Sequence, residues 1–509
     1  MKVPPHLSLG VILSLLLSWL PVSAFALSLE DARHLVARTG FGVATPQQVE
    51  PLLGMSRAQA VDHIVEAARD AGPLESPYWV EDSHIMYLDL ASEANRELHG
   101  DSVAERYRDE LLQHYSCVAH KSAAHWWRPL VNSETPLREK MTLFWSDHFA
   151  TGYDKVGMYN PLVRQKQTLR RHAMGSFYDL LYAISIDPAM LVYLDQYLSR
   201  EGAINENFAR EVMELFTLGV GGGYTEDDIK EAARAFTGWR IREWGKGFVF
   251  DSRMHDYGEK TVLGKVVAEA TTTTDHNVAG RDALRIMMEH PSTARYITSK
   301  LWRAFISPDP DPTEVDRLAR AFETSGYNIS TLMRELLLSE AFWAPSNRHT
   351  LIKTPVDIVA GAARIGGLKI GPADYRNEPR VYEYYPGYDP ENLRTVEIHY
   401  CTKDDSENIP VTNQLHWMAT NLGMELYVPP NVSGWRYGEE WVNTATVAER
   451  VSYAIQLAGG AEQYAGLGAD QIETLVLGRS PMNPIDGYDR MSLHEKVNNL
   501  IKDPVFQVK

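Results

Sequence analysis

The chain has 509 residues, with 67 Asp and Glu against 50 Lys and Arg, so its formal net charge is −17. Its 44% apolar and 23% charged residues are typical of a globular protein rather than a disordered one. The acidity argues against a general nucleic-acid binder, which needs a basic surface, and two cysteines are too few for a disulfide scaffold or a four-cysteine zinc module.

Residues 1–26 are predicted to form a cleavable signal peptide. Lys2 precedes an apolar run over residues 9–20, Pro21 ends that run, and Ala24-Phe25-Ala26 has the small-x-small pattern of a signal-peptidase site. The run is too short to cross a hydrocarbon core of roughly 30 Å as a stable anchor, although an uncleaved N-terminal anchor is the alternative. We therefore predict a periplasmic or secreted protein.

The remainder, residues 27–509, is predicted to be a single large, mainly α-helical domain. Apolar residues recur there with helical spacing, and alternating strand patterns are rare. The main exception is a predicted β-hairpin near 247–267, in which 247–251 would pair with 261–267 around a polar loop. Residues 369–411, rich in proline, tyrosine and acidic residues, are predicted to be an irregular excursion from the domain, because flexible linkers are seldom so aromatic.

The first candidate site residue is His148, in a helix predicted after Thr135-Pro136. At about 100° per residue, His148 shares a stripe with apolar residues such as Met141 and Phe144. One interpretation is a core histidine hydrogen-bonded to a carbonyl group. The other is a metal ligand or proton carrier, because a buried imidazole suits both roles.

A second predicted helix, residues 205–218, places Arg210, Glu211 and Glu214 on its polar side, opposite a wide apolar face. The simple interpretation is a solvated face with an Arg210–Glu214 ion pair. The functional interpretation is that Glu211 and Glu214 present two carboxylates to a metal or proton-transfer site. Arg210 would then orient one carboxylate or bind a substrate anion.

The loop of the predicted hairpin contains His255-Asp256, and this pair by itself is compatible with an ordinary turn. In combination with His148 and the two glutamates, however, it would complete a set of imidazoles and carboxylates without thiolates. Such a set suits zinc, iron or manganese. The chain has no G-x-S-x-G, H-E-x-x-H or C-x-x-C-H string. The motifs of the serine nucleophile elbow, of zinc metalloproteases and of c-type haem attachment are therefore absent from the sequence.

Several strings taken together resemble the bacterial family called domain of unknown function 1800. The matching strings are at residues 37–42, 139–150, 207–219, 224–226, 255–256, 290–291, 300–302, 353–355, 429–435 and 500–507. They cover nearly all of the predicted mature chain, which favours one large domain over several.

The resemblance implies an exported, helical protein and a sulfatase-like exported protein as a partner, but it identifies no substrate. The family motif falls on His148, Arg210, Glu211, Glu214, His255 and Asp256. The tyrosine-rich segment 369–411 is extended relative to the family pattern. A disulfide between Cys117 and Cys401, which export would allow, would then be particular to this protein.

These patterns lead to one hypothesis and one alternative. The hypothesis is an exported enzyme that catalyses hydrolysis or oxidation, with His148, Glu211 and His255 as acid–base groups or as ligands of a divalent metal such as zinc, iron or manganese. Glu214, Arg210 and Asp256 would orient them, since ligating imidazoles need hydrogen-bonding partners. The alternative is a non-catalytic scaffold or secretion partner whose charged motif is a buried structural network.

Overall fold

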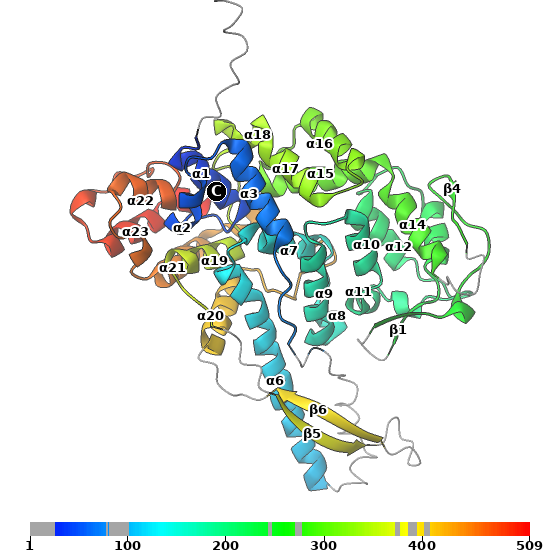
Figure 1. Cartoon of the computed structure of the whole chain (residues 1–509). Coiled ribbons are helices and arrows are strands. Elements are labelled where there is room, and N and C mark those ends of the chain that lie inside the picture. Colours follow the sequence, from blue (N-terminus) through cyan, green and yellow to red (C-terminus); the bar gives the residue numbers. More distant parts are fainter. Residues whose placement is uncertain are drawn as a thin grey trace, which may run out of the picture.

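The computed structural model confirms the prediction of a mainly α-helical protein (Figure 1). It describes the backbone of residues 26–77, 80, 101–242, 247–269, 277–371, 377–384, 394–401 and 408–509. All of the predicted signal peptide except Ala26 lies outside these residues.

Most helices of the N-terminal half follow a Ser, Thr or Asp N-cap residue, and several have Pro in the first turn; these residues satisfy or tolerate the free N–H groups there. They are α1 Leu29–Thr39, α2 Pro46–Val49, α3 Arg57–Asp70, α6 Asp101–Asn132, α7 Pro136–His148, α8 Tyr153–Val156, α9 Tyr159–His172, α10 Phe177–Ser185, α11 Pro188–Tyr193, α12 Asn207–Glu211 and α13 Glu226–Ala235. No helix among the described residues is both long and apolar enough to cross a membrane.

One segment of this half departs from the α-helical prediction for residues 205–218. Helix α12 continues directly into a π-helix, Val212–Thr217. Leu218 N donates to the Met213 carbonyl, five residues earlier, at 2.9 Å. Because π-helical turns are rare and occur frequently at functional sites, this segment is a natural place to look for one.

The C-terminal half follows the same pattern of short, capped helices. They are α14 Val278–Met288, α15 Pro291–Phe305, α16 Pro312–Thr324, α17 Ile329–Leu338, α18 Glu340–Trp343, α19 Pro355–Ile365, α20 Asn408–Asn421, α21 Thr444–Ala458, α22 Ala469–Val476 and α23 Leu493–Lys502. Short 3-10 helices are at Glu50–Leu52, Gln196–Leu198, Ser252–Met254, Pro345–Asn347, Gly438–Trp441, Glu462–Tyr464, Tyr488–Arg490 and Pro504–Gln507.

The predicted strands near 247–267 exist, but the predicted pairing between them is wrong. Strand β2 (Gly247–Phe250) pairs with β1 (Trp239–Arg242), whereas β3 (Thr261–Val262) pairs with β4 (Lys265–Val266). Leu263 and Gly264, with φ of 51° and 72°, form the two-residue turn between β3 and β4. Positive φ at both positions matches the right-handed twist of the strands, so the local hairpin wins over the longer-range pairing.

The segment 369–411 is also more regular than predicted where the structure describes it. Strands β5 (Asn377–Tyr384) and β6 (Arg394–Cys401) form an antiparallel pair. Valine and tyrosine occur in both strands and isoleucine in β6, and these residue types favour strands. Figure 1 shows this pair beside α6, away from the main helical body, and β6 contacts α6.

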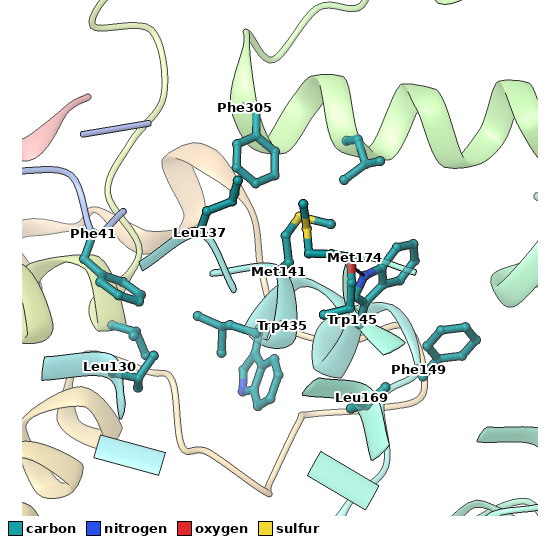
Figure 2. Close-up of a cluster of buried hydrophobic side chains, with 14 of the residues drawn as sticks. Phe41, Leu130, Leu137, Met141, Trp145, Phe149, Leu169, Met174, Phe305 and Trp435 are labelled. Carbon is teal, nitrogen blue, oxygen red and sulfur yellow. Dashed lines mark hydrogen bonds between the residues drawn. The ribbon is translucent and has the colours of Figure 1, made fainter. Parts of the chain in front are cut away.

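Helix α7 lies in the centre of the packed body. It contacts α1, α3, α6 and α9, and it buries Leu137, Met141 and Trp145. Figure 2 shows these three side chains in one apolar cluster with Trp435, which comes from the loop after α20. Because both sides of α7 are covered, its charged residues are also held inside the protein, and this feature positions the candidate site.

Candidate functional site

His148, the last residue of α7, is a buried histidine (2% exposed) in an aromatic environment. Its Nε2 lies 3.1 Å from the carbonyl oxygen of Phe216 and, since a carbonyl only accepts, Nε2–H is the donor. Nδ1 has no hydrogen-bond partner among the described residues. The surrounding rings are those of Phe144, Trp145, Phe149, Phe216 and Tyr296. These contacts support the interpretation of a core histidine bonded to a carbonyl group.

His148 is expected to make the protein less stable in acid. Burial, followed by the charge of Lys300, holds the pKa of His148 well below its usual value. Below about pH 6.5 the unfolded chain therefore binds a proton that the folded chain does not. We expect His148→Phe to make the dependence of unfolding free energy on pH shallower by up to about 1.4 kcal/mol per pH unit.

The measurement is urea unfolding of wild type and variant at several pH values between 6.5 and 4.5. The control is His63→Gln, because His63 is an exposed histidine on α3. An unchanged slope in His148→Phe would show that this residue is not the neutral buried group described above.

Next to His148, the Asp147 carboxylate holds the loop that contains Trp435 and Tyr437. Oδ1 accepts from the Trp435 backbone N–H at 2.7 Å, and Oδ2 accepts from the Tyr437 hydroxyl. Burial raises the pKa of Asp147, while the charge of Lys300 opposes that rise. Because its pKa is raised, this carboxyl group keeps its proton up to a higher pH than an ordinary aspartate does.

Helix α15 contributes two side chains to the same site, Lys300 and Tyr296, which are one turn apart on the helix. Burial lowers the pKa of Lys300, with Asp147 acting in the opposite direction. Its ammonium nitrogen is 5.7 Å from the centre of the Tyr296 ring. Burial, together with the charges of Asp147 and Glu214, raises the pKa of Tyr296 to about 12. Tyr296 thus lies within electrostatic range of carboxylates from two different helices.

The structure brings Glu211 and Glu214 together with each other and connects Glu214 to this site. Burial, followed by the charge of Glu214, raises the pKa of Glu211. Glu214 also acts on Tyr296. We refer to Asp147, Lys300, Tyr296, Glu214 and Tyr437 as the Asp147 cluster.

Arg210 has a different main partner from those predicted. Its guanidinium forms a bidentate ion pair with Glu226, at 2.8 and 2.7 Å, and lies 3.6 Å from Glu206. Glu226 is the first residue of α13, and its carboxylate accepts hydrogen bonds from Arg210 on α12. Arg210 therefore joins two helices at the surface, although its charge still reaches Glu214.

Two glycines allow the elements of the Asp147 cluster to approach one another. Gly434 has φ of +91°, and a Cβ atom there would lie 2.3 Å from Asp147 Oδ1. Gly219, after the π-helix, has φ of +85°, and a Cβ atom there would lie 2.7 Å from the Tyr296 ring. At both positions only glycine combines the left-handed backbone with this close contact.

His255 and Asp256 lie in a separate hydrogen-bonded network. His255 is buried, with Nδ1 2.8 Å from the Thr237 carbonyl and Nε2 3.5 Å from Glu269. Asp256 accepts two hydrogen bonds from Arg234, at 2.8 and 3.1 Å. None of these contacts includes a member of the Asp147 cluster. Their arrangement ties the segment after β2 to the end of α13.

The predicted metal ligands are therefore not brought together as one group. Across the described ranges, no three His, Cys, Asp or Glu residues are grouped so that they could hold a metal ion. His148 and His255 also each direct a ring nitrogen at a backbone carbonyl, where that nitrogen serves the fold. Helical spacing correctly placed His148 on an apolar face, but it could not show which other residues meet that face.

Sequence reasoning missed Asp147, Lys300 and Tyr437 as site residues. Asp147 and Lys300 stand inside strings that carry the family resemblance, 139–150 and 300–302, and Tyr437 follows the string 429–435 by two residues. The available signal was the joint occurrence of these strings rather than the periodicity of any one helix. The structure shows why they occur together, because segments distant in sequence meet at one carboxylate.

Comparison with protein families identifies a match over residues 34–503. The matching family model is described as a protein of unknown function, DUF1800. No curated protein and no solved structure matches the chain.

Proposed function

Because this chain belongs to the DUF1800 family, as its motifs predicted, we propose its activity from the geometry of its own residues: it is a hydrolase whose acid–base site is the Asp147 cluster. The observation that carries this proposal is that the pKa values of two groups, each within electrostatic range of the other, are shifted in opposite directions. The pKa of Asp147 is raised and the pKa of Lys300 is lowered, in each case mainly by burial. Paired groups displaced in this way are typical of acid–base catalysis.

The chemistry follows from the two protonation states. The proposal requires Lys300 as an amine and Asp147 as a carboxylic acid, the forms that the lowered pKa of Lys300 and the raised pKa of Asp147 favour. In these forms the Lys300 amine would accept a proton from an attacking water molecule, and the Asp147 carboxyl group would donate its proton to the leaving group. The Lys300 ammonium and the Asp147 carboxylate then exchange a proton to restore the starting pair. Tyr437, which is 55% exposed, donates to Asp147, which is itself only partly buried, so this carboxyl group lies near the surface.

A substrate screen tests this proposal. The purified mature protein would be incubated with nitrophenyl carboxylate esters, phosphates, sulfates and glycosides, beside a doubly substituted protein, Asp147→Asn with Lys300→Met. We expect wild type to turn over at least one class and the double variant to lose that turnover. Absence of turnover in every class, or equal turnover in both proteins, would contradict the proposal.

A specific observation also favours the second candidate, a non-catalytic scaffold. The polar groups of buried His255 and of partly buried Asp256 and Arg234 are bonded within the fold, as expected of a structural network. In that case both proteins in the screen would be inactive. A sulfatase-like exported protein, which the family resemblance implies as a partner, would then be expected to co-purify with wild type.

We further propose that the protein is exported and carries a Cys117–Cys401 disulfide. Cys117 is buried on α6, no cysteine among the described residues is free, and β6, which ends at Cys401, contacts α6. We expect non-reducing mass mapping of the exported protein to find an N-terminus at Leu27 and a Cys117–Cys401 peptide. An intact residue 1, or two free thiols under the same conditions, would contradict these two expectations separately.

A further inference from the structure

A cavity of about 580 Å³ lies at the C-terminal end of α9 and is separate from the Asp147 cluster. Among the residues that the structure describes, its wall includes four arginines and no acidic residue, although the chain as a whole is strongly acidic. The arginines are Arg138, Arg164, Arg170 and Arg171. Basic residues in a last helical turn often only complement the helix dipole. That explanation covers Arg170 and Arg171 but not Arg138, which comes from the start of α7.

Arg138 is a buried member of this wall with an unsatisfied hydrogen-bond donor among the described residues. Its side chain is 6% exposed, and its Nε has no hydrogen-bond partner among the described residues. Its Nη2 reaches only two backbone carbonyls, those of Ala71 and Arg171, each at the long distance of 3.4 Å. A buried guanidinium normally has an anionic partner, because removal of its charge from water costs several kcal/mol.

Glu139 and Asp70 act on Arg138 through their charge, but among the described residues neither forms an ion pair with it, and Asp70 is already paired with Arg69. Glu139, the nearest buried carboxylate, is engaged by Arg170 through three hydrogen bonds of 2.7 to 3.1 Å. Burial, followed by the positive charge of Arg170, lowers the pKa of Arg138, so the site favours incoming negative charge. Gln167 adds a second buried donor, since its Nε2 also has no hydrogen-bond partner among the described residues.

We propose that this cavity binds a small molecule through an oxyanion group, a phosphate, sulfate or carboxylate, with Arg138, Arg171 and Gln167 as donors. Guanidinium groups match these oxyanions because they present parallel N–H donors to two oxygens. The cavity volume lies within the usual range for small-molecule sites and exceeds what a bare inorganic ion needs. The proposed ligand is therefore an organic molecule with an anionic head group.

Thermal unfolding and calorimetric titration of the full mature protein test this site, with inorganic phosphate, inorganic sulfate and acetate as separate probes at constant ionic strength. We expect at least one probe to bind saturably and raise the unfolding temperature. Comparison of the phosphate, sulfate and acetate titrations then identifies the preferred head group. In Arg138→Gln and Arg171→Gln the affinity should fall at least tenfold. Arg171 is exposed, so its variant tests the site even if Arg138→Gln folds poorly.

The matched control is Arg295→Gln, because Arg295 is an exposed arginine on α15 that pairs with Asp316 and is not part of the cavity wall. Its affinity should equal that of wild type. No saturable binding of any probe, or equal affinity in wild type and in Arg171→Gln, would overturn the proposal.

Discussion

Replacement of Asp357 by asparagine is expected to lower the free energy of unfolding by about 3–5 kcal/mol at pH 7, because it leaves buried charge without a counterion. Asp357, on α19, is fully buried and accepts from Lys140 Nζ at 2.5 Å and from Lys509 Nζ at 2.6 Å. Both lysines are themselves buried. The carboxylate therefore joins α7, α19 and the last residue of the chain at a place that water cannot reach.

The same carboxylate makes a defined contribution to the dependence of stability on pH. Burial by itself would raise the pKa of Asp357, but the charges and hydrogen bonds of Lys140 and Lys509 outweigh burial and lower it. A carboxyl group with a lowered pKa stabilises the folded protein fully above its unfolded value of about 4, and this contribution is lost as the pH falls below that value. The difference in unfolding free energy between wild type and Asp357→Asn should therefore become smaller as the pH falls below about 4.

Chemical unfolding of three variants checks this prediction. Asp195→Asn is the control, because Asp195 forms an exposed ion pair with Lys155 and its loss should cost no more than about 1 kcal/mol. The combination of Asp357→Asn with Lys140→Met removes one stranded charge and should recover part of the loss. Equal stability of wild type and Asp357→Asn would show that the buried lysines find other partners.

The second large effect concerns the proposed site. Replacement of Lys300 by methionine is expected to lower kcat/KM by about 10²–10⁴-fold on whichever substrate class the screen identifies, the range for loss of a general acid or base. Stability should change little, because methionine fills similar space and relieves a charge whose burial is unfavourable. Asp147→Asn should lower the rate to a similar extent and remove the limb of the pH–rate profile that reports the carboxyl group.

The control for this prediction lies on the same helix. Arg295 is on α15 and pairs with Asp316 at 2.7 Å at the surface, so Arg295→Gln should keep the wild-type rate. Circular dichroism and the unfolding temperature would be recorded for every variant. A fully active Lys300→Met, or a loss of rate that only follows a loss of folded protein, would refute the assigned roles.

The sequence predicted much of the local structure correctly, because local structure depends on neighbouring residues. Helix α7 begins at Pro136, in agreement with the helix predicted after Thr135-Pro136. The same reasoning failed where competing pairings were available. The strand at 247–250 pairs with residues before it because the strand at 261–262 forms its own tight turn.

The candidate site was predicted only in part, for a related reason. Periodicity placed His148 on the buried face of its helix, in agreement with the structure. It also placed Glu211 and Glu214 near each other, although Glu214 lies in a π-helix rather than in the predicted α-helix. It could not show that Asp147, the residue before His148, lies within electrostatic range of Lys300 and binds a loop almost 300 residues away. Contacts of that separation depend on how helices pack, which no local pattern encodes.

By itself, the sequence determined the helical class, the family and the residues that the family motifs contain, since composition, spacing and strings are properties of the chain. Only the tertiary structure decided which of those residues share an environment. It separated His255 and Asp256 from His148, paired Arg210 with Glu226, and placed Asp147 beside Lys300. The physical reason is burial: the pKa of an acid or a base changes when packing removes it from water and sets another charge beside it.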